Sequence, residues 1–274
     1  MLTQAEKGKN FRTLHERAGA FIIPNPWDVG TARLLAHLGF EALATTSAGY
    51  AFSVGQRDNT VGRDRMMRHV AEIASATDLP VSADLENGFG DSPEAVAETI
   101  RLAAAAGLVG CSIEDMASSP ERVIYDLEFA AERVRAAAEA ARGLLFPFTL
   151  TARAENYLVG RRDLSDTIRR LQAYGEAGAN VVYAPGLTDR EEIASLVRSV
   201  DRPVNVILGI KGVQLSLAEL SEIGVKRVSV GSALARAALG AFLRAAREMQ
   251  SRGTFTFADE AVSFAEISSM FGGL

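Results

Sequence analysis

The sequence has few of the side chains on which several large enzyme classes depend. Cys111 is the single cysteine, so no disulfide can form within the chain. The three histidines, His15, His37 and His69, all lie in segments that we expect to be helical. None of them falls at the end of a predicted strand, which argues against a Ser-His-Asp hydrolase and against a histidine-ligated zinc site.

Lysine is scarce as well, and the chain has only Lys7, Lys9, Lys211 and Lys226. A Schiff-base aldolase needs a buried lysine, and of these four only Lys211 lies near the end of a predicted strand. Because lysine is rarely buried in folded proteins, we interpret Lys211 as a solvated loop charge.

An excess of positive charge and long apolar runs are also missing. The net charge is −5, with no run of basic residues, so neither a nucleic-acid groove nor an anionic membrane surface is expected as a partner. No apolar stretch approaches the roughly 20 residues that span a bilayer. The polar N-terminus lacks the apolar core of a signal peptide. These features predict a soluble cytoplasmic protein with no nucleic-acid and no membrane partner.

The chain does contain a regular alternation of short apolar segments with alanine-rich helical stretches. Its 48% apolar content is enough for one large core. Eight strands alternating with helices over this length predict a (β/α)₈ barrel of the TIM type, with residues 1–274 as a single domain. The predicted strands are Phe21–Pro24, Ala42–Thr46, Val81–Asp84, Gly110–Glu114, Phe148–Ala152, Val181–Ala184, Val204–Ile207 and Val228–Val230. The helical segments between them include Pro93–Ala106, Leu127–Arg142, Asp163–Ala177, Asp189–Ser199 and Leu215–Ile223.

A doubly wound sheet is the alternative fold, and it usually carries a glycine-rich turn after its first strand. Here that strand is followed by Asn25-Pro26-Trp27-Asp28, which favours the barrel. After the eighth strand a long helix is predicted over Ser232–Arg252, and a C-terminal helical extension occupies about 254–274. A barrel does not need this extension, which could cap the barrel or dock on another subunit.

Carboxylates gather where the predicted strands end, which is the end of a barrel that carries the active site. Asp84 ends the third strand and Glu86 follows it, and alternation predicts that the two side chains point the same way. Glu114 ends the adjacent strand. Three carboxylates at one rim repel one another unless a cation lies between them, and oxygen ligands without histidine or thiolate suit Mg²⁺ or Mn²⁺. The alternative is that they cap helices or pair with arginines.

Two further features of the rim suggest recognition of an anion. Arg153 follows the fifth strand, and its guanidinium can bind a carboxylate through two parallel hydrogen bonds. The alternative is an ion pair with Glu155 or another acid of the rim. Gly209, Gly212 and Gly231 with Ser232 could form a phosphate cradle, although glycine is also routine at such turns.

The segment Val81–Gly90, with the sequence VSADLENGFG, resembles the metal-binding stretch of the isocitrate lyase/phosphoenolpyruvate mutase superfamily. Other matching segments agree in order and spacing, so the resemblance covers nearly the whole chain from about Phe21. They are Pro24–Asp28, Thr46–Gly49 with Asp58 beyond it, Ser112–Asp115 and Thr151–Glu155.

The resemblance implies a function for several of these residues. Asp84 would bind Mg²⁺ directly, while Glu86, Glu114 and Asp58 would hold its water ligands. The backbone of Ser47, Ala48 and Gly49, together with Arg153, would bind the substrate carboxylate. The superfamily uses a (β/α)₈ barrel, often exchanges a C-terminal helix between subunits, and commonly forms tetramers, so a homotetramer or dimer is expected.

The sequence departs from the lyases of that superfamily in two places. The loop 116–125, which we expect to close over the site, lacks the cysteine, histidine and lysine that the lyases carry there. Tyr183-Ala184-Pro185-Gly186 stands where the lyases carry a glutamate after the sixth strand. Cys111 lies within the fourth strand and is expected in the core.

We therefore expect a magnesium-dependent lyase that cleaves a C–C bond of a small 2-oxo or 2-hydroxy di- or tricarboxylic acid through an enolate. Oxaloacetate-like acids are favoured, with isocitrate or methylisocitrate cleaved weakly. Asp58 and Tyr50 are the candidates for a catalytic base, and Asn205 on the seventh strand is a further candidate for substrate binding.

Two alternatives remain open at the level of sequence. The first is an enzyme that acts on a C–P bond of phosphonopyruvate or phosphoenolpyruvate, with Arg122, Arg161 and Arg162 as cationic partners. The second is a barrel without catalytic activity that binds 2-oxo acids, which the loss of the lyase cysteine favours.

Overall fold

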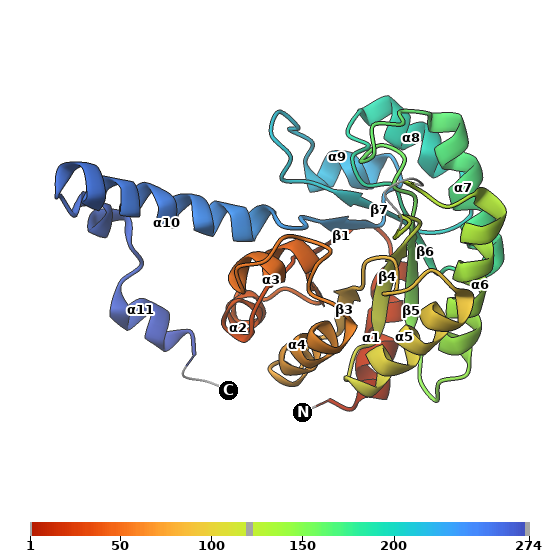
Figure 1. Cartoon of the computed structure of the whole chain (residues 1–274), viewed down its shortest axis with the longest axis horizontal. Helices are drawn as coiled ribbons and strands as arrows, with labels where there is room; N and C mark the ends of the chain where they lie inside the picture. The colour runs from red at the N-terminus through yellow and green to blue at the C-terminus, as the bar shows by residue number, and fades with distance from the viewer. Residues whose placement is uncertain (1, 119–122, 272–274) are drawn as a thin grey trace.

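Eight short parallel strands form one sheet in the order β1-β8-β7-β6-β5-β4-β3-β2, and helices cover its outer face (Figure 1). The structure is a computed structural model that describes residues 2–118 and 123–271. The predicted (β/α)₈ barrel is confirmed. The strands are β1 Phe21–Ile23, β2 Leu43–Ala44, β3 Val81–Asp84, β4 Gly110–Glu114, β5 Thr149–Arg153, β6 Val181–Tyr183, β7 Val204–Ile207 and β8 Arg227–Ser229.

The helices follow the strands as the alternation predicts. The second strand ends at Ala44 instead of the predicted Thr46, and the Thr46 side chain caps the helix that follows. The helices are α1 Gln4–Glu16, α2 Val29–His37, α3 Ser47–Ser53, α4 Arg63–Ser75, α5 Pro93–Ala105, α6 Leu127–Arg142, α7 Leu164–Ala177, α8 Arg190–Ser199, α9 Leu217–Glu222, α10 Ala233–Arg252, the 3₁₀ turn η1 Thr256–Glu260 and α11 Phe264–Ser269.

The barrel closes between β1 and β2 through individual hydrogen bonds, and the side chain of Asn25 contributes to this closure. Its Oδ1 accepts the backbone N–H groups of Val230 and Gly231 at 2.8 and 2.9 Å, and its Nδ2 donates to the Thr45 carbonyl at 3.1 Å. The Ala44 N–H also donates to the Pro24 carbonyl. One buried amide thus links the ends of β1, β2 and β8.

Helix α1 closes the opposite end of the barrel. Phe11 and Leu14 pack against Phe21 in a small core cluster beneath the strands. The ring of His15 lies edge-on to Phe11 and Phe21, its Nδ1 lies 2.8 Å from the Phe11 carbonyl, and its Nε2 lies 3.4 Å from Nη1 of Arg227. Because a carbonyl only accepts, Nδ1 carries the proton and Nε2 accepts from Arg227.

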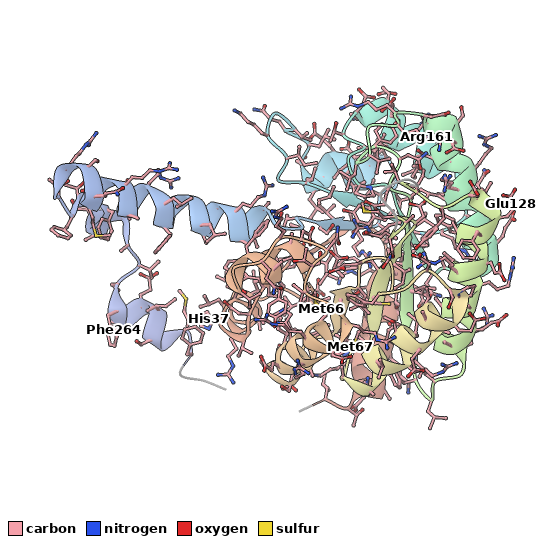
Figure 2. The ribbon with its side chains drawn as sticks, viewed as in Figure 1. His37, Met66, Met67, Glu128, Arg161 and Phe264 are labelled. Atoms are coloured by element: carbon pink, nitrogen blue, oxygen red, sulfur yellow. The ribbon has the colours of Figure 1, made fainter. Side chains whose placement is uncertain are left out.

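Helix α10 leaves the barrel instead of packing along it, and α11 turns back beneath it (Figure 1). Among the described residues of α10 only Ala235 is buried, while Phe242 is 67% exposed. Phe264 of α11 also points away from the barrel (Figure 2) and is 87% exposed. The chain therefore departs from the barrel at α10, before residue 254. Within the described ranges, no helix is both long and apolar enough to span a bilayer.

Replacing Asn25 with alanine should destabilise the fold by about 2–4 kcal/mol, because two buried N–H groups and one carbonyl would lose their partner. Urea unfolding measures this difference. Gln172→Ala is the control, since it removes one exposed hydrogen bond to the Ser199 carbonyl and should cost less than about 1 kcal/mol. An Asn25→Ala variant as stable as the control would show that this amide does not hold the barrel closed.

The environment of His15 predicts a loss of stability in acid. Burial and the adjacent Arg227 lower the pKa of His15 to about 3. The unfolded chain takes up a proton near pH 6.5, whereas the folded chain does not, so this stability is present above pH 6.5 and is lost as the pH falls toward 3. The loss attributable to His15 is on the order of 4 kcal/mol.

In His15→Gln, which keeps a donor for Phe11 and an acceptor for Arg227, the unfolding free energy should fall less steeply between pH 6.5 and 3. The exposed residue His37 offers the matched control, His37→Gln. Identical pH profiles for the parent and His15→Gln would contradict a buried neutral imidazole.

Candidate active site

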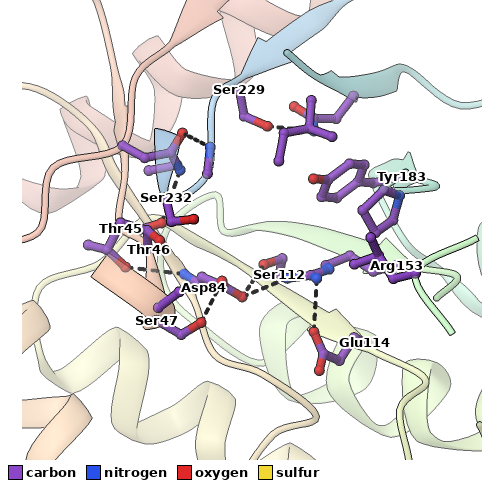
Figure 3. Close-up of a pocket in the computed structure, with 18 of the residues that line it drawn as sticks. Thr45, Thr46, Ser47, Asp84, Ser112, Glu114, Arg153, Tyr183, Ser229 and Ser232 are labelled. Carbon is purple, nitrogen blue, oxygen red and sulfur yellow. Dashed lines mark hydrogen bonds and ion pairs between the residues drawn. The ribbon is translucent and has the colours of Figure 1, made fainter. Parts of the chain in front are cut away.

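A cavity of about 300 Å³ opens at the carboxyl ends of the strands (Figure 3). Its polar lining follows from strand alternation, because inward-facing positions lie two residues apart. On β3, β4 and β8 both inward positions are polar and line the cavity, and on β5 Thr151 precedes Arg153 in the same way. The pairs that line it are Ser82 and Asp84, Ser112 and Glu114, and Arg227 and Ser229.

Asp84 is held at the end of β3 by donors from three neighbouring segments. Its Oδ1 accepts from Nη1 of Arg153 at 2.9 Å and from the Ser112 hydroxyl at 3.3 Å, and its Oδ2 accepts from the Ser47 hydroxyl at 3.0 Å. Its backbone N–H donates to the Thr45 hydroxyl. The orientation of this carboxylate is therefore set by the protein.

Arg153 contacts three carboxylates. Nη1 lies 2.9 Å from Asp84, Nη2 lies 3.0 Å from Glu114 Oε2, and Nε lies 2.9 Å from Glu155 Oε1. Burial opposes the positive charge, yet the carboxylates raise the pKa of Arg153, so the guanidinium stays protonated. The alternative expectation of an ion pair between Arg153 and Glu155 is thus realised in this structure, together with contacts to Asp84 and Glu114.

The carboxyl groups around Arg153 outnumber it, and their ionised forms are destabilised by burial and mutual repulsion. Burial raises the pKa of Glu114 well above its usual value, and burial likewise raises the pKa of Glu155, although Arg153 opposes both shifts. Partial burial and the nearby charge of Asp84 raise the pKa of Asp58, which lines the mouth of the cavity. Uncompensated negative charge at one end of a barrel is the electrostatic setting that a cation relieves.

Glu86 lies beside this group in an adjoining hollow that it shares with Glu114 and Asn87. The strand ends at Asp84 and Glu86 adopts a left-handed φ of 52°, so the expected alternation does not continue to Glu86. Its Oε1 is buried without a hydrogen-bond partner among the described residues. Burial, followed by the charges of Asp84 and Asp58, raises the pKa of Glu86 to about 7.

The donor set fits a magnesium ion held largely through water. Within the described part of the chain, no three histidine, cysteine or carboxylate side chains converge on one point. Mg²⁺ typically keeps several water ligands and binds one or two carboxylates. Asp84 can therefore be the single direct ligand without two further side chains converging on the ion. The unpartnered oxygen of Glu86 has the chemistry of an acceptor for metal-bound water.

A second network holds Glu155 and hence the segment after Arg153. Asp115 Oδ1 accepts the Glu155 N–H at 2.8 Å, and Asp115 Oδ2 accepts from Arg170 Nη1 at 2.9 Å and from the Tyr174 hydroxyl at 2.6 Å. All four residues of this network are buried. This network was not predicted from the sequence, because Arg170 and Tyr174 lie on α7 rather than at a strand end.

The start of α3 matches the sequence prediction in part. Ser47 and Ala48 line the cavity. Gly49 does not, and its N–H donates to the Thr46 hydroxyl as part of the helix cap. Tyr50 is also outside the lining residues, and its ring stacks on His69 with centroids 3.5 Å apart. Its place on the helix therefore turns Tyr50 away from the carboxylates.

The opposite wall holds residues that the sequence reasoning passed over. Asn205, which was predicted, lines the cavity with Tyr183, Ser229 and Arg227. Figure 3 shows Tyr183 and Ser229 across the pocket from Ser47 and Glu114. The sequence signal for this wall was the alternation of polar residues along β8, at Arg227 and Ser229. Because Arg227 follows Lys226, the basic pair resembled surface charge at the start of the strand.

The loop predicted to cover the site is described only at its ends. Met116 pairs with Ile124, and the Ala117 N–H donates to the Val123 carbonyl, so the ends form the base of a hairpin. Arg122, a proposed phosphonate partner, lies outside the described residues. Arg161 and Arg162 are exposed and do not line the cavity, and Arg161 lies at the periphery of the barrel (Figure 2). Cys111 is buried in the main core, as predicted.

The sequence profile of the phosphoenolpyruvate phosphomutase family matches residues 11–250. An uncharacterized protein of Mycobacterium tuberculosis strain H37Rv is 36% identical over 87% of this chain and 88% of its own length. A 2-methylisocitrate lyase of Aeropyrum pernix is 26% identical over 90% of this chain and 81% of its own length.

Solved structures agree with these relatives. A crystal structure from Burkholderia cenocepacia J2315, provisionally assigned as a lyase or mutase, shares 64% identity and a TM-score of 0.96, over 98% of this chain and 97% of that one. A 2,3-dimethylmalate lyase of the PEP mutase/isocitrate lyase superfamily shares 25% identity with a TM-score of 0.85, over 99% and 95%. A phosphonopyruvate hydrolase solved with oxalate and Mg²⁺ has the same fold, with 24% identity and a TM-score of 0.86, over 99% and 95%.

The barrel therefore has the fold of these enzymes, and the chain is a member of the phosphoenolpyruvate phosphomutase family within the isocitrate lyase/PEP mutase superfamily.

Proposed function

We propose that this protein is a Mg²⁺-dependent lyase that cleaves a C–C bond of a small 2-oxo or 2-hydroxy diacid, with oxaloacetate-like acids as favoured substrates. One observation carries the proposal. Five carboxyl groups, those of Asp58, Asp84, Glu86, Glu114 and Glu155, gather at the catalytic end of the barrel, and Arg153 forms ion pairs with only three of them. Such an excess of negative charge calls for a divalent cation.

Asp84 would hold Mg²⁺, and Glu86, Glu114 and Asp58 would hold its water ligands. Mn²⁺ has similar ligand preferences and should substitute for it. When bound, the metal would stabilise the negative charge that develops on the keto oxygen as an enolate forms. The phosphonopyruvate hydrolase with bound Mg²⁺ and oxalate supports this assignment by fold.

Arg153 and the start of α3 would bind the substrate carboxylate. A cation at Asp84 would take over the neutralisation that Arg153 now supplies, which frees donors of the guanidinium for a ligand. Ser47 and Ala48 contribute the cavity wall beside it. Gly49 supports this wall through its cap hydrogen bond rather than through a free N–H group.

Asp58 is the candidate base for a reaction that requires one. Its carboxyl lies at the mouth of the cavity, and its raised pKa makes it a better proton acceptor than an ordinary aspartate. Tyr50 is not retained in this role, because its ring stacks on His69 outside the cavity. A decarboxylation of oxaloacetate needs no such base, because CO₂ leaves without a proton.

A C–P bond enzyme is the second candidate, since the family is named for a phosphomutase. A phosphonate group needs cationic partners, and Arg161 and Arg162 stand outside the cavity. The lack of the lyase cysteine favours a third candidate, a barrel that binds 2-oxo acids without turning them over. The three candidates differ in their products and in whether they turn the substrate over, so one assay separates them.

The assay is ¹H and ³¹P NMR of the protein with oxaloacetate, isocitrate, 2-methylisocitrate and phosphonopyruvate, each with Mg²⁺ and with EDTA. Oxaloacetate should be cleaved only with Mg²⁺, at a rate above that of Mg²⁺ and buffer without protein. Products from phosphonopyruvate alone would assign the C–P reaction. Ligand binding without products across the panel would support the non-catalytic candidate.

Asp84→Asn should lower kcat/KM for the cleaved acid by at least about 1000-fold, because it removes the one direct metal ligand. The same NMR assay measures this loss in metal-replete buffer. Glu128→Gln, at an exposed carboxylate of α6, is the matched control (Figure 2). Full activity of Asp84→Asn would refute the metal assignment.

We also propose that the protein forms a homotetramer or dimer, in which α10 and α11 of one copy cover the barrel of another. Leu239, Phe242 and Leu243 of α10 and Phe264 of α11 are exposed. Ile22 on β1 is exposed as well, on the flank that α10 leaves uncovered. Helices with such apolar surface require a partner to be stable in water.

Phe242→Glu should shift the molecular mass measured by light scattering toward the monomer, because it places a charge within this apolar surface. Leu145→Glu is the control, since Leu145 is fully exposed in the turn between α6 and β5. A parent protein that is already monomeric at micromolar concentration would refute the proposed assembly.

A further inference from the structure

Arg227 enters the barrel from the start of β8 and lines the cavity, although the residue is only 5% exposed. Its three nitrogen atoms contact neutral partners alone. Nε donates to Asn205 Oδ1 at 2.8 Å, Nη2 donates to the Thr151 hydroxyl at 2.9 Å, and Nη1 lies 3.4 Å from His15 Nε2. The guanidinium is thus a buried cation inside the barrel.

The other buried arginines of the described chain are neutralised differently. Arg153 and Arg170 each form ion pairs with carboxylates. Arg133 is enclosed by four backbone carbonyls and the face of the Tyr125 ring. Arg227 has no ion pair to any described residue. A buried charge is costly unless an opposite charge or a full set of hydrogen bonds compensates it.

Arg227 has capacity for such a partner. A guanidinium carries five N–H groups in a fork, and the three contacts above use three of them. One N–H group on each terminal nitrogen is left without a partner among the described residues. Two N–H groups on different terminal nitrogens are the pair that can bind the two oxygens of a carboxylate.

The neighbours of Arg227 also present donors. Because Asn205 Oδ1 accepts from Arg227, the amide orientation is fixed and Nδ2 donates to the Ser229 hydroxyl at 3.0 Å. Ser229 therefore keeps its own proton, which can point to the nearby Tyr183 hydroxyl. The Tyr183 O–H is then available to donate into the cavity that it lines. Figure 3 shows Ser229 and Tyr183 together on this wall.

We propose that Arg227, Asn205 and Tyr183 form a second anion subsite, which binds the distal carboxylate of the substrate. The site presents N–H and O–H donors and a positive charge, with no carboxylate within it. The inference rests on the proposed function, in which Asp84 and Arg153 take the other end of the same molecule. It deepens that function by naming the residues that bind the second carboxylate of the diacid.

The test is calorimetric binding of two ligands to the full chain in the presence of Mg²⁺. Oxalate is short and reports on the Asp84 and Arg153 end alone, whereas 3,3-difluorooxaloacetate carries a distal carboxylate. Arg227→Gln should weaken binding of difluorooxaloacetate by about 10- to 100-fold, the range for charge-assisted hydrogen bonds, and change oxalate binding by less than about twofold. Arg227→Lys, which keeps the charge but not the fork, should fall between the two.

Lys211→Gln is the control for a general effect of charge, because it removes a positive charge from the exposed loop after β7 and should leave both affinities unchanged. Equal weakening of both ligands by Arg227→Gln would assign Arg227 a merely structural role and overturn the subsite. Unchanged affinity for difluorooxaloacetate would overturn it as well.

The parent protein provides a test that does not depend on the folding of a variant. The 4-carboxamide analogue of difluorooxaloacetate has the same shape without the distal charge, and it should bind about 10-fold or more weakly. Equal affinity for the acid and the amide would overturn the subsite. Stronger binding of phosphonopyruvate than of difluorooxaloacetate, lost in Arg227→Gln, would overturn the assignment to a carboxylate in favour of a phosphonate.

Oxalate separates failure of this inference from failure of the proposed function. If oxalate binds the parent protein only in the presence of Mg²⁺ and does not bind the Asp84→Asn variant, the proposed site stands. The Arg227 results then decide the subsite alone. If oxalate does not bind the parent with Mg²⁺, the proposed function and the subsite that rests on it both fall.

Discussion

The contact of Arg153 with three carboxylates organises the catalytic end of this barrel. Asp84, Glu114 and Glu155 come from β3, β4 and the segment after β5, and the guanidinium holds all three within 3.0 Å. Without that charge, the carboxylates would either repel one another or take up protons. The carboxyl groups in the site still outnumber the guanidinium groups, and the proposed Mg²⁺ would neutralise part of this excess.

The alternation of side chains along the strands positions these groups at one end of the barrel. Strand alternation turns every second side chain inward, and on β3, β4, β5 and β8 the inward positions are polar near the carboxyl ends. The apolar filling of an ordinary barrel core is therefore replaced by a polar cavity in its upper part. Asn25 closes the barrel beside this cavity, and α1 seals the other end with Phe11 and His15.

The fold and most of the rim could be predicted from the sequence, because both depend on periodicity and on the ends of strands. Eight strands, Asp84, Glu114 and Arg153 lie where alternation places them. Glu86 departs from the prediction, since its left-handed φ interrupts the alternation. Residues on the helix α3 were also harder to place, because a helix turns Tyr50 away within one turn of Ser47.

Arg227 shows a further limit of sequence reasoning. A charged residue beside Lys226 at the start of a strand looks like surface charge, and only the inward direction of β8 reveals a cation inside the cavity. The described structure thus contains two arginines in one cavity with opposite surroundings, Arg153 among acids and Arg227 among neutral groups. A diacid bound between a metal and these two cations would use both.

The proposed function requires a divalent cation and a carboxylate ligand to bind where Arg153 now bridges Asp84 and Glu114. A crystal structure of the protein grown with Mg²⁺ and oxalate tests it most directly. We expect a metal ion on Asp84, oxalate bound to both the metal and Arg153, and no direct contact between Arg153 and Asp84. A structure in which Arg153 still bridges both carboxylates, with no metal at Asp84 under saturating Mg²⁺ and oxalate, would contradict it.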